Sequence, residues 1–142
     1  MPRFYCSEPL AIGATIALPD AVAHHVFVLR MQPGDPLCLF DGGGGEYRAT
    51  LASSDKRRAT AVIDSHAAHE AELPWQVTLV QALPEGSKMD WIIEKAVELG
   101  VTAIQPLAAR RCVVKLSAER AGKKQDHWQA VIVAASEQSG RN

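Results

Sequence analysis

Three positively charged side chains in the second half of the sequence have types suited to binding or catalysis: Arg111, Lys115 and Arg141. Guanidinium and ammonium groups donate charge-assisted hydrogen bonds, so they can hold a phosphate or a negative charge that develops during a reaction. Each has a structural alternative. Arg141 follows a predicted helix, where a cation complements the helix dipole, and Arg111 and Lys115 can belong to a solvated loop. The sequence leaves both interpretations open.

Two polar side chains, Glu137 and Gln138, fall at the end of that predicted helix. Gln138 lies three residues after Ala135 and seven after Val131, so we expect it near the apolar stripe of the helix. A buried polar side chain there needs a hydrogen-bond partner. The partner is either a bound molecule or an open backbone carbonyl nearby, and the end of this helix is therefore a candidate binding site.

The first half offers a second group of cations: Arg3, Arg30 and the run Lys56-Arg57-Arg58. Such residues bind the phosphates of a nucleic acid in many proteins. A basic turn is also common on a solvated face that binds nothing. The pattern favours neither interpretation over the other.

Other suggestive patterns are weaker. The run Gly42–Gly45 is not followed by Gly-Lys-Ser/Thr, so a hairpin loop is favoured over a phosphate-binding loop. His24-His25 with Cys6 or Cys38 has no metal-ligand spacing, and we expect a structural role. The three cysteines are an odd number without a CxxC pair, which is typical of reduced thiols in a cytosolic protein.

The elements of the first half are predicted to be mostly strands. Short apolar runs alternate with turn residues such as Pro33-Gly34-Asp35, a pattern typical of a small barrel. One helix, from Asp20 to about Met31, interrupts them. The predicted strands cover residues 3–6, 15–18, 36–40, 46–51 and 59–64.

Residues 66–75 have no clear period and are predicted to be a linker between two domains. A β-branched run at 76–82 then predicts a buried strand. Ser87 is expected to cap a helix that ends at Gly100, with Asp90 as its capping-box partner. The apolar stripe of this helix is Met89, Ile92, Ile93, Ala96 and Val97.

A second strand at 101–107 completes a strand–helix–strand unit with a right-handed crossover. After a loop at 108–116, Ser117 is expected to cap a long helix that Gly140 closes. The stripe of this helix is Ala121, Trp128, Val131, Ile132 and Ala135. Two strands and two helices make a small core, which is marginal for a domain of about 70 residues.

The composition is that of a soluble globular protein: 142 residues, of which 47% are hydrophobic and 22% charged. The formal net charge of −1 does not by itself indicate a nucleic-acid binder. The N-terminus lacks the apolar core of a signal peptide, and no apolar run approaches the length that spans a membrane. We therefore expect a soluble, cytoplasmic protein.

An ordered series of motifs runs over nearly the whole chain. In the second half it consists of 85–90, 94–101, Ile104, Pro106, 111–116, 119–120, Lys124, 128–129 and 137–141, and in the first half of His24, 29–31, 34–35 and 41–42. Taken together, the series resembles the RsmE-type ribosomal RNA methyltransferases. The stretches 85–90 and 94–101 look like the first strand–helix–strand unit of that family, 111–116 looks like its next motif, and the first-half residues match its N-terminal domain.

The resemblance implies a mixed α/β fold. It places a PUA-like RNA-binding β-barrel at 1–70 and, at 76–142, the first part of a SPOUT-type methyltransferase domain without its C-terminal knot. It implies methylation of N3 of a uridine in small-subunit (16S) ribosomal RNA by a cytoplasmic homodimer that uses S-adenosyl-L-methionine. No catalytic residue is assigned. The residues expected to bind RNA or substrate are Arg30, Arg111, Lys115, Glu137, Gln138 and Arg141.

The sequence also departs from the family. The Gly-rich GPEGG-like loop and the RTETA-like segment that bind the methyl donor lie after the point where this sequence ends. We therefore expect the 142-residue chain to lack a complete donor pocket and to be inactive, whatever the longer protein does. A non-catalytic RNA-binding module that uses the barrel alone is the alternative, and the reading frame beyond Asn142 would distinguish the two.

Overall fold

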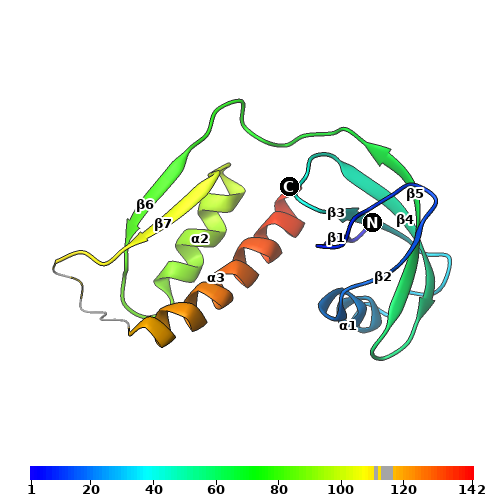
Figure 1. Ribbon diagram of the computed structural model, residues 1–142, viewed down its shortest axis with the longest axis horizontal. Coiled ribbons are helices and arrows are strands. Elements are labelled where there is room, and N and C mark those ends of the chain that lie inside the picture. Colours follow the sequence, from blue (N-terminus) through cyan, green and yellow to red (C-terminus); the bar gives the residue numbers. More distant parts are fainter. Residues whose placement is uncertain (111, 113–116) are drawn as a thin grey trace. The chain divides into compact units, whose positions relative to one another are not determined.

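The computed structural model describes residues 1–110, 112 and 117–142. The chain divides into two compact units, Met1–Ala71 with Asn142 and Glu72–Arg141. Both contain helices and strands (Figure 1), so the predicted mixed α/β fold class is confirmed. In the part of the chain that the structure describes, no helix combines the length and the apolar character needed to cross a membrane.

The first unit is a five-stranded sheet with one helix. Its strands pair in the order β1-β3-β4-β5-β2, with β1 parallel to β3 and the other pairs antiparallel. All five predicted strands and the predicted helix are present, although the helix ends earlier and β4 and β5 run further than expected. Their bounds are β1 Arg3–Tyr5, β2 Thr15–Ala17, α1 Asp20–Val28, β3 Pro36–Phe40, β4 Glu46–Ser54 and β5 Ala59–Ala67.

The core of this unit is built around β3, which is buried along four of its five residues. Leu37 and Leu39 are fully buried there, and Ile63 of β5 is 1% exposed. Helix α1 adds Val26, also fully buried, to the same cluster. Apolar side chains at alternating strand positions therefore meet one face of a short helix, which is how a small sheet of this kind buries its apolar surface.

The second unit is a strand–helix–strand arrangement followed by a long helix. The bounds are β6 Thr78–Ala82, α2 Lys88–Glu98, β7 Ala103–Leu107 and α3 Ala118–Ser139. Strands β6 and β7 are parallel, as predicted, with Leu79 opposite Ile104. Helices α2 and α3 pack against each other beside this two-stranded sheet (Figure 1).

The core of the second unit lies between its two helices. Met89, Ile93 and Val97 of α2 meet Trp128 and Ala135 of α3, all of them buried. These residues belong to the two apolar stripes predicted from their spacing of three and four residues.

The prediction of a buried strand at β6 is wrong. Both strands of this sheet alternate between exposed and half-buried residues, and Val80 is 60% exposed. The reason is that the two-stranded sheet packs on one face only: Ile104 of β7 joins the core of α2 and α3. The opposite face carries the exposed side chains, and a parallel strand needs cover on both faces to be buried.

The ends of the two helices agree with the predicted caps in part. Ser117 caps α3 and its hydroxyl accepts a hydrogen bond from the Arg120 amide at 3.4 Å, and Gly140 closes α3 with a positive φ of 77°. Ser87 is the N-cap of α2 but makes no side-chain cap hydrogen bond. Asp90 is instead paired with His127 of α3, with 2.6 Å between Oδ2 and Nε2.

Candidate functional site

Arg141 lies in the interior of the Glu72–Arg141 unit, with 7% of its surface exposed. Its Nη1 donates to the carbonyl oxygens of Val97 at 2.7 Å and Val101 at 2.8 Å, on either side of the turn that ends α2. Its Nε donates to both carboxylate oxygens of Glu72, at 3.0 and 3.2 Å, and Nη2 also donates to Glu72. The guanidinium therefore ties the chain after α3 to the end of α2.

Sequence reasoning missed Glu72 as the partner of Arg141, because it falls within the stretch 66–75 predicted to be a linker. The residue is 69 positions away from its partner Arg141, so no local pattern connects the two. The same stretch also packs at Gly100, where a Cβ would lie 2.6 Å from Cδ1 of Leu73. The second half of the predicted linker is thus a packed part of the second unit.

The end of α3 carries Glu137 half-buried and Gln138 exposed. The expectation that Gln138 lies near the apolar stripe is not met, because the buried face of the last turns runs through Ala135 and Ser136. Gln138 is exposed and does not belong to that buried face. Near it, the Ser139 hydroxyl is buried and has no hydrogen-bond partner among the described residues.

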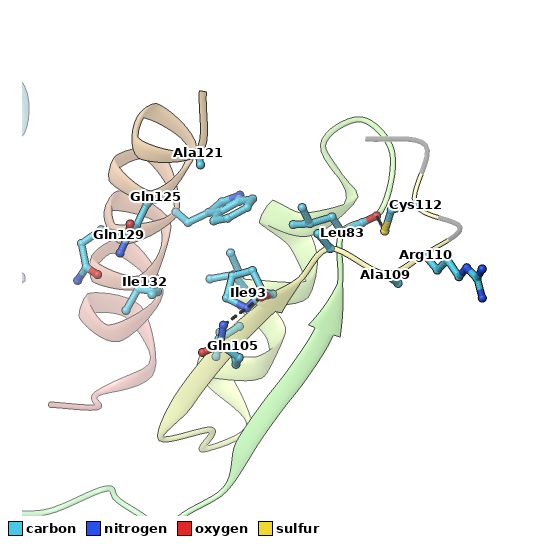
Figure 2. Close-up of a pocket in the computed structure, with 14 residues that line it drawn as sticks. Leu83, Ile93, Gln105, Ala109, Arg110, Cys112, Ala121, Gln125, Gln129 and Ile132 are labelled. Carbon is cyan, nitrogen blue, oxygen red and sulfur yellow. Dashed lines mark hydrogen bonds between the residues drawn. The ribbon is translucent and has the colours of Figure 1, made fainter. Parts of the chain in front are cut away.

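A pocket of about 740 Å³ lies between β7, α2 and α3 (Figure 2). Its lining is mainly apolar, with Ile93, Ile104 and Trp128 among its side chains, and its amide groups come from Gln105, Gln125 and Gln129. No Asp or Glu is among the described residues that line it. The pocket can therefore bind an apolar or amide-like group, but its described lining offers no carboxylate as a general base.

The loop after β7 forms one end of this pocket. The Cys112 thiol donates to the carbonyl oxygen of Leu83 at 3.2 Å, which agrees with the packing role expected for this cysteine. The side chain of Arg110 extends away from α3 (Figure 2). Arg111 and Lys115, which we predicted to bind RNA or substrate, lie outside the described residues.

Arg30, the candidate in the first unit, is exposed and has a positive φ of 56°. It follows α1, where its amide donates to Phe27 O at 3.0 Å and the Met31 amide donates to Val26 O at 3.1 Å. These are the two hydrogen bonds of a Schellman motif, whose left-handed position usually holds glycine. Among the described residues, Arg30 alone has a positive φ without being glycine. The guanidinium is therefore presented from a fixed but strained backbone.

Arg3 makes contacts within the first unit and does not lie on an open surface. Its Nε lies 3.4 Å from Oε2 of Glu46, and its guanidinium stands 3.7 Å from the centre of the Phe40 ring. The Cys38 thiol donates to the same Glu46 oxygen at 3.3 Å. Burial, followed by the hydrogen bond and charge of Glu46, raises the pKa of Cys38 from 9.0 to about 11. This thiol stays protonated at neutral pH.

Two family models match the chain. One, described as an RNA methyltransferase domain, matches residues 71–142, and the other, described as an RNA methyltransferase PUA domain, matches residues 18–64. The chain therefore belongs to the RNA methyltransferase family.

The chain is also similar to curated proteins of the RsmE type. It is 42% identical over 140 residues to the ribosomal RNA small subunit methyltransferase E of Synechocystis sp., covering 98% of this chain and 44% of the relative. It is 36% identical over 146 residues to the protein of the same name from Bacillus subtilis, covering 100% of this chain and 57% of the relative. The chain thus spans about half the length of the curated relatives that it matches.

Two solved structures are similar to this one. A ribosomal RNA small subunit methyltransferase E from Neisseria gonorrhoeae, bound to S-adenosyl methionine, has a TM-score of 0.95 and 45% sequence identity. A putative methyltransferase from Legionella pneumophila, in complex with the same cofactor, has a TM-score of 0.94 and 35% identity. Each match covers 99% of this chain and 58% of the other.

Proposed function

We propose that the complete protein carrying these residues transfers a methyl group from S-adenosyl-L-methionine to N3 of a uridine in small-subunit (16S) ribosomal RNA. The observation that carries the proposal is the similarity, over 99% of the chain, to two proteins whose structures contain S-adenosyl methionine. In this proposal residues 1–70 are a PUA-like RNA-binding domain and residues 76–142 begin a SPOUT-type methyltransferase domain. The complete protein acts in the cytoplasm as a homodimer.

The described lining of the pocket in the second unit offers no carboxylate to the methyl donor. S-adenosyl-L-methionine carries a sulfonium and an ammonium group, and a carboxylate forms strong charge-assisted hydrogen bonds with an ammonium group. The described lining holds the cation Arg110, three glutamines and the aromatic Trp128, and no Asp or Glu. We therefore propose that other parts of the complete protein bind the donor, and we assign no step of the transfer to this pocket.

In this proposal the residues at the end of α3 contribute to the binding of the RNA. N3 of uridine carries a proton whose pKa in the free nucleoside is above neutral, so the reaction needs a proton acceptor or hydrogen bonds that stabilise the anion. The exposed Gln138 has a donor and an acceptor that match the imide edge of uracil, and Glu137 stands beside it on the last turn of α3. In this proposal Arg141 acts as a positioning residue, because it fixes the chain directly after that turn.

The proposal predicts N3-methyluridine when the complete protein is incubated with unmethylated small ribosomal subunits and the donor. Mass spectrometry of digested RNA measures the product, and light scattering of the same preparation reports whether the protein is a dimer. Residues 1–142 alone should form no product, and calorimetric titration should detect no tight one-to-one binding of the donor. Absence of N3-methyluridine with the complete protein, while RNA still binds, would favour the non-catalytic binding module.

Replacing Arg30 with glycine should separate fold stability from RNA affinity. A non-glycine residue in the left-handed region costs about 1–2 kcal/mol, and glycine loses about 0.5–1 kcal/mol of that gain through its more flexible unfolded state. The variant should therefore be as stable as the original or up to about 1.5 kcal/mol more stable by urea denaturation. RNA binding in a filter assay should weaken at the same time. Unchanged affinity would remove Arg30 from the RNA-binding surface.

A further inference from the structure

The turn between β4 and β5 holds three consecutive cations, Lys56, Arg57 and Arg58, all of them exposed. The turn has a defined conformation. The Asp55 carboxylate accepts hydrogen bonds from the backbone amides of Arg57 at 2.7 Å and Arg58 at 2.8 Å, and the Asp55 amide donates to Arg58 O at 2.8 Å. These amide bonds, with the nearby Arg58 charge as a smaller cause, hold the pKa of Asp55 below its usual value of 3.8.

The strands next to the turn are fixed as well. The hydroxyls of Ser53 and Thr60 are hydrogen-bonded across the two strands at 2.7 Å, and Thr50 bonds to Asp64 at 2.7 Å further along the same pair. Figure 1 shows β4 and β5 as the two longest strands of the first unit, and the turn is at one end of them. The three cations therefore stand on a preorganised hairpin, which reduces the entropy lost when they bind a ligand.

The side chains of these cations form no ion pair with any other described residue. Asp55, the carboxylate next to them, directs its hydrogen-bonding oxygen to the backbone instead. The other exposed cations of the structure include paired ones: Lys123 lies 3.0 Å from Glu119 on α3. A run of unpaired cations, two of them with planar guanidinium groups, is suited to oxygen atoms that repeat at close spacing, as in a phosphate backbone.

We propose that this turn, defined by residues 55–58, is a docking point for the phosphate backbone of RNA, with Arg57 and Arg58 as the contacts. The proposal rests on the RNA-binding function proposed above. The contact recognises the charge and spacing of the phosphates and does not distinguish the bases, because phosphate oxygens carry no sequence information. It adds affinity and orients the RNA relative to the first unit.

The test is the salt dependence of RNA binding by the complete protein. Fluorescence anisotropy with a short labelled RNA hairpin, in a series of KCl concentrations, gives the slope of log Kd against log salt concentration. Arg57→Ala and Arg58→Ala should each lower that slope by about 1 and weaken binding by roughly 3- to 10-fold at low salt. The matched control is Lys123→Ala, which also removes one exposed cation and should change neither quantity.

The possible outcomes separate this inference from the proposed function. If the original protein binds the hairpin and the arginine variants keep its slope, or if Lys123→Ala lowers the slope equally, the turn is not a docking point while RNA binding stands. If the original protein does not bind RNA, both proposals fall. Loss of binding to phosphatidylglycerol vesicles in the arginine variants, with the RNA slope unchanged, would point to a membrane partner and would also overturn the inference.

Discussion

Replacing Arg141 with alanine should lower the free energy of unfolding of the second unit by about 3–5 kcal/mol. The substitution leaves the half-buried Glu72 carboxylate without its bidentate partner and removes the donors to Val97 O and Val101 O. A charge and carbonyl groups that lose their partners inside a protein cost more than the original pair contributed. Urea denaturation followed by tryptophan fluorescence measures the effect, because the three tryptophans of the chain all lie within residues 72–141.

Two further variants make this result interpretable. Arg141→Lys keeps the charge but cannot make the forked contact. Its free energy of unfolding should therefore lie between those of the original protein and of Arg141→Ala. Lys123→Ala breaks an exposed ion pair on α3 and should change the free energy of unfolding by less than about 0.5 kcal/mol. If Arg141→Ala is as stable as Lys123→Ala, the network around Glu72 does not hold the end of α3. If Arg141→Ala does not fold, Arg141→Lys alone decides the question.

Replacing Leu39 with alanine should destabilise the first unit by about 2–5 kcal/mol. Leu39 is fully buried in β3, the strand between β1 and β4, so its truncation leaves a cavity in the apolar core of the first unit. Tryptophan fluorescence does not report on this unit, because residues 1–71 contain no tryptophan. Hydrogen exchange at the backbone amides of β3 and β4 is therefore the suitable measurement. The amides that exchange most slowly in the original protein should exchange faster in the variant.

The control for this substitution is another leucine of the same unit. Leu29 is 50% exposed at the end of α1, and Leu29→Ala should change the exchange of β3 and β4 by less than a factor of about 3. An equal effect of the two substitutions would mean that the cluster around Leu39 is not the centre of stability of this unit.

Much of the fold was predictable because the spacing of apolar residues and the residues at helix ends are local signals of secondary structure. The stripe that includes Met89, Ile93 and Val97 repeats every three to four residues and is the buried face of α2. Ser117 and Gly140 are local signals for the two ends of a helix, and both ends of α3 agree with them. Strand positions in the first unit followed in the same way from short apolar runs between turn residues.

What the sequence did not predict depends on partners far apart in the chain. Asp90 was expected to complete a cap with Ser87, but its carboxylate pairs with His127, 37 residues later. The role of Glu72 depends on Arg141, and nothing near either residue signals the pair. Arg141 was considered for RNA binding or for the helix dipole, and neither interpretation includes its contacts with the end of α2. Long-range polar pairs leave no periodic pattern, so a single sequence does not reveal them.

The glycines between β3 and β4 differ in the space around them, and this difference has a practical use. A Cβ at Gly45 would lie 2.5 Å from both Ala67 O and His66 Nε2, and the Gly45 amide is bonded to Glu70. A Cβ at Gly42 would meet nothing within 4 Å. A dye-bearing peptide or an epitope for imaging is therefore best inserted next to Gly42, with Gly42 itself kept because its φ is 81°, whereas a side chain at Gly45 would collide with Ala67 and His66 at the end of β5.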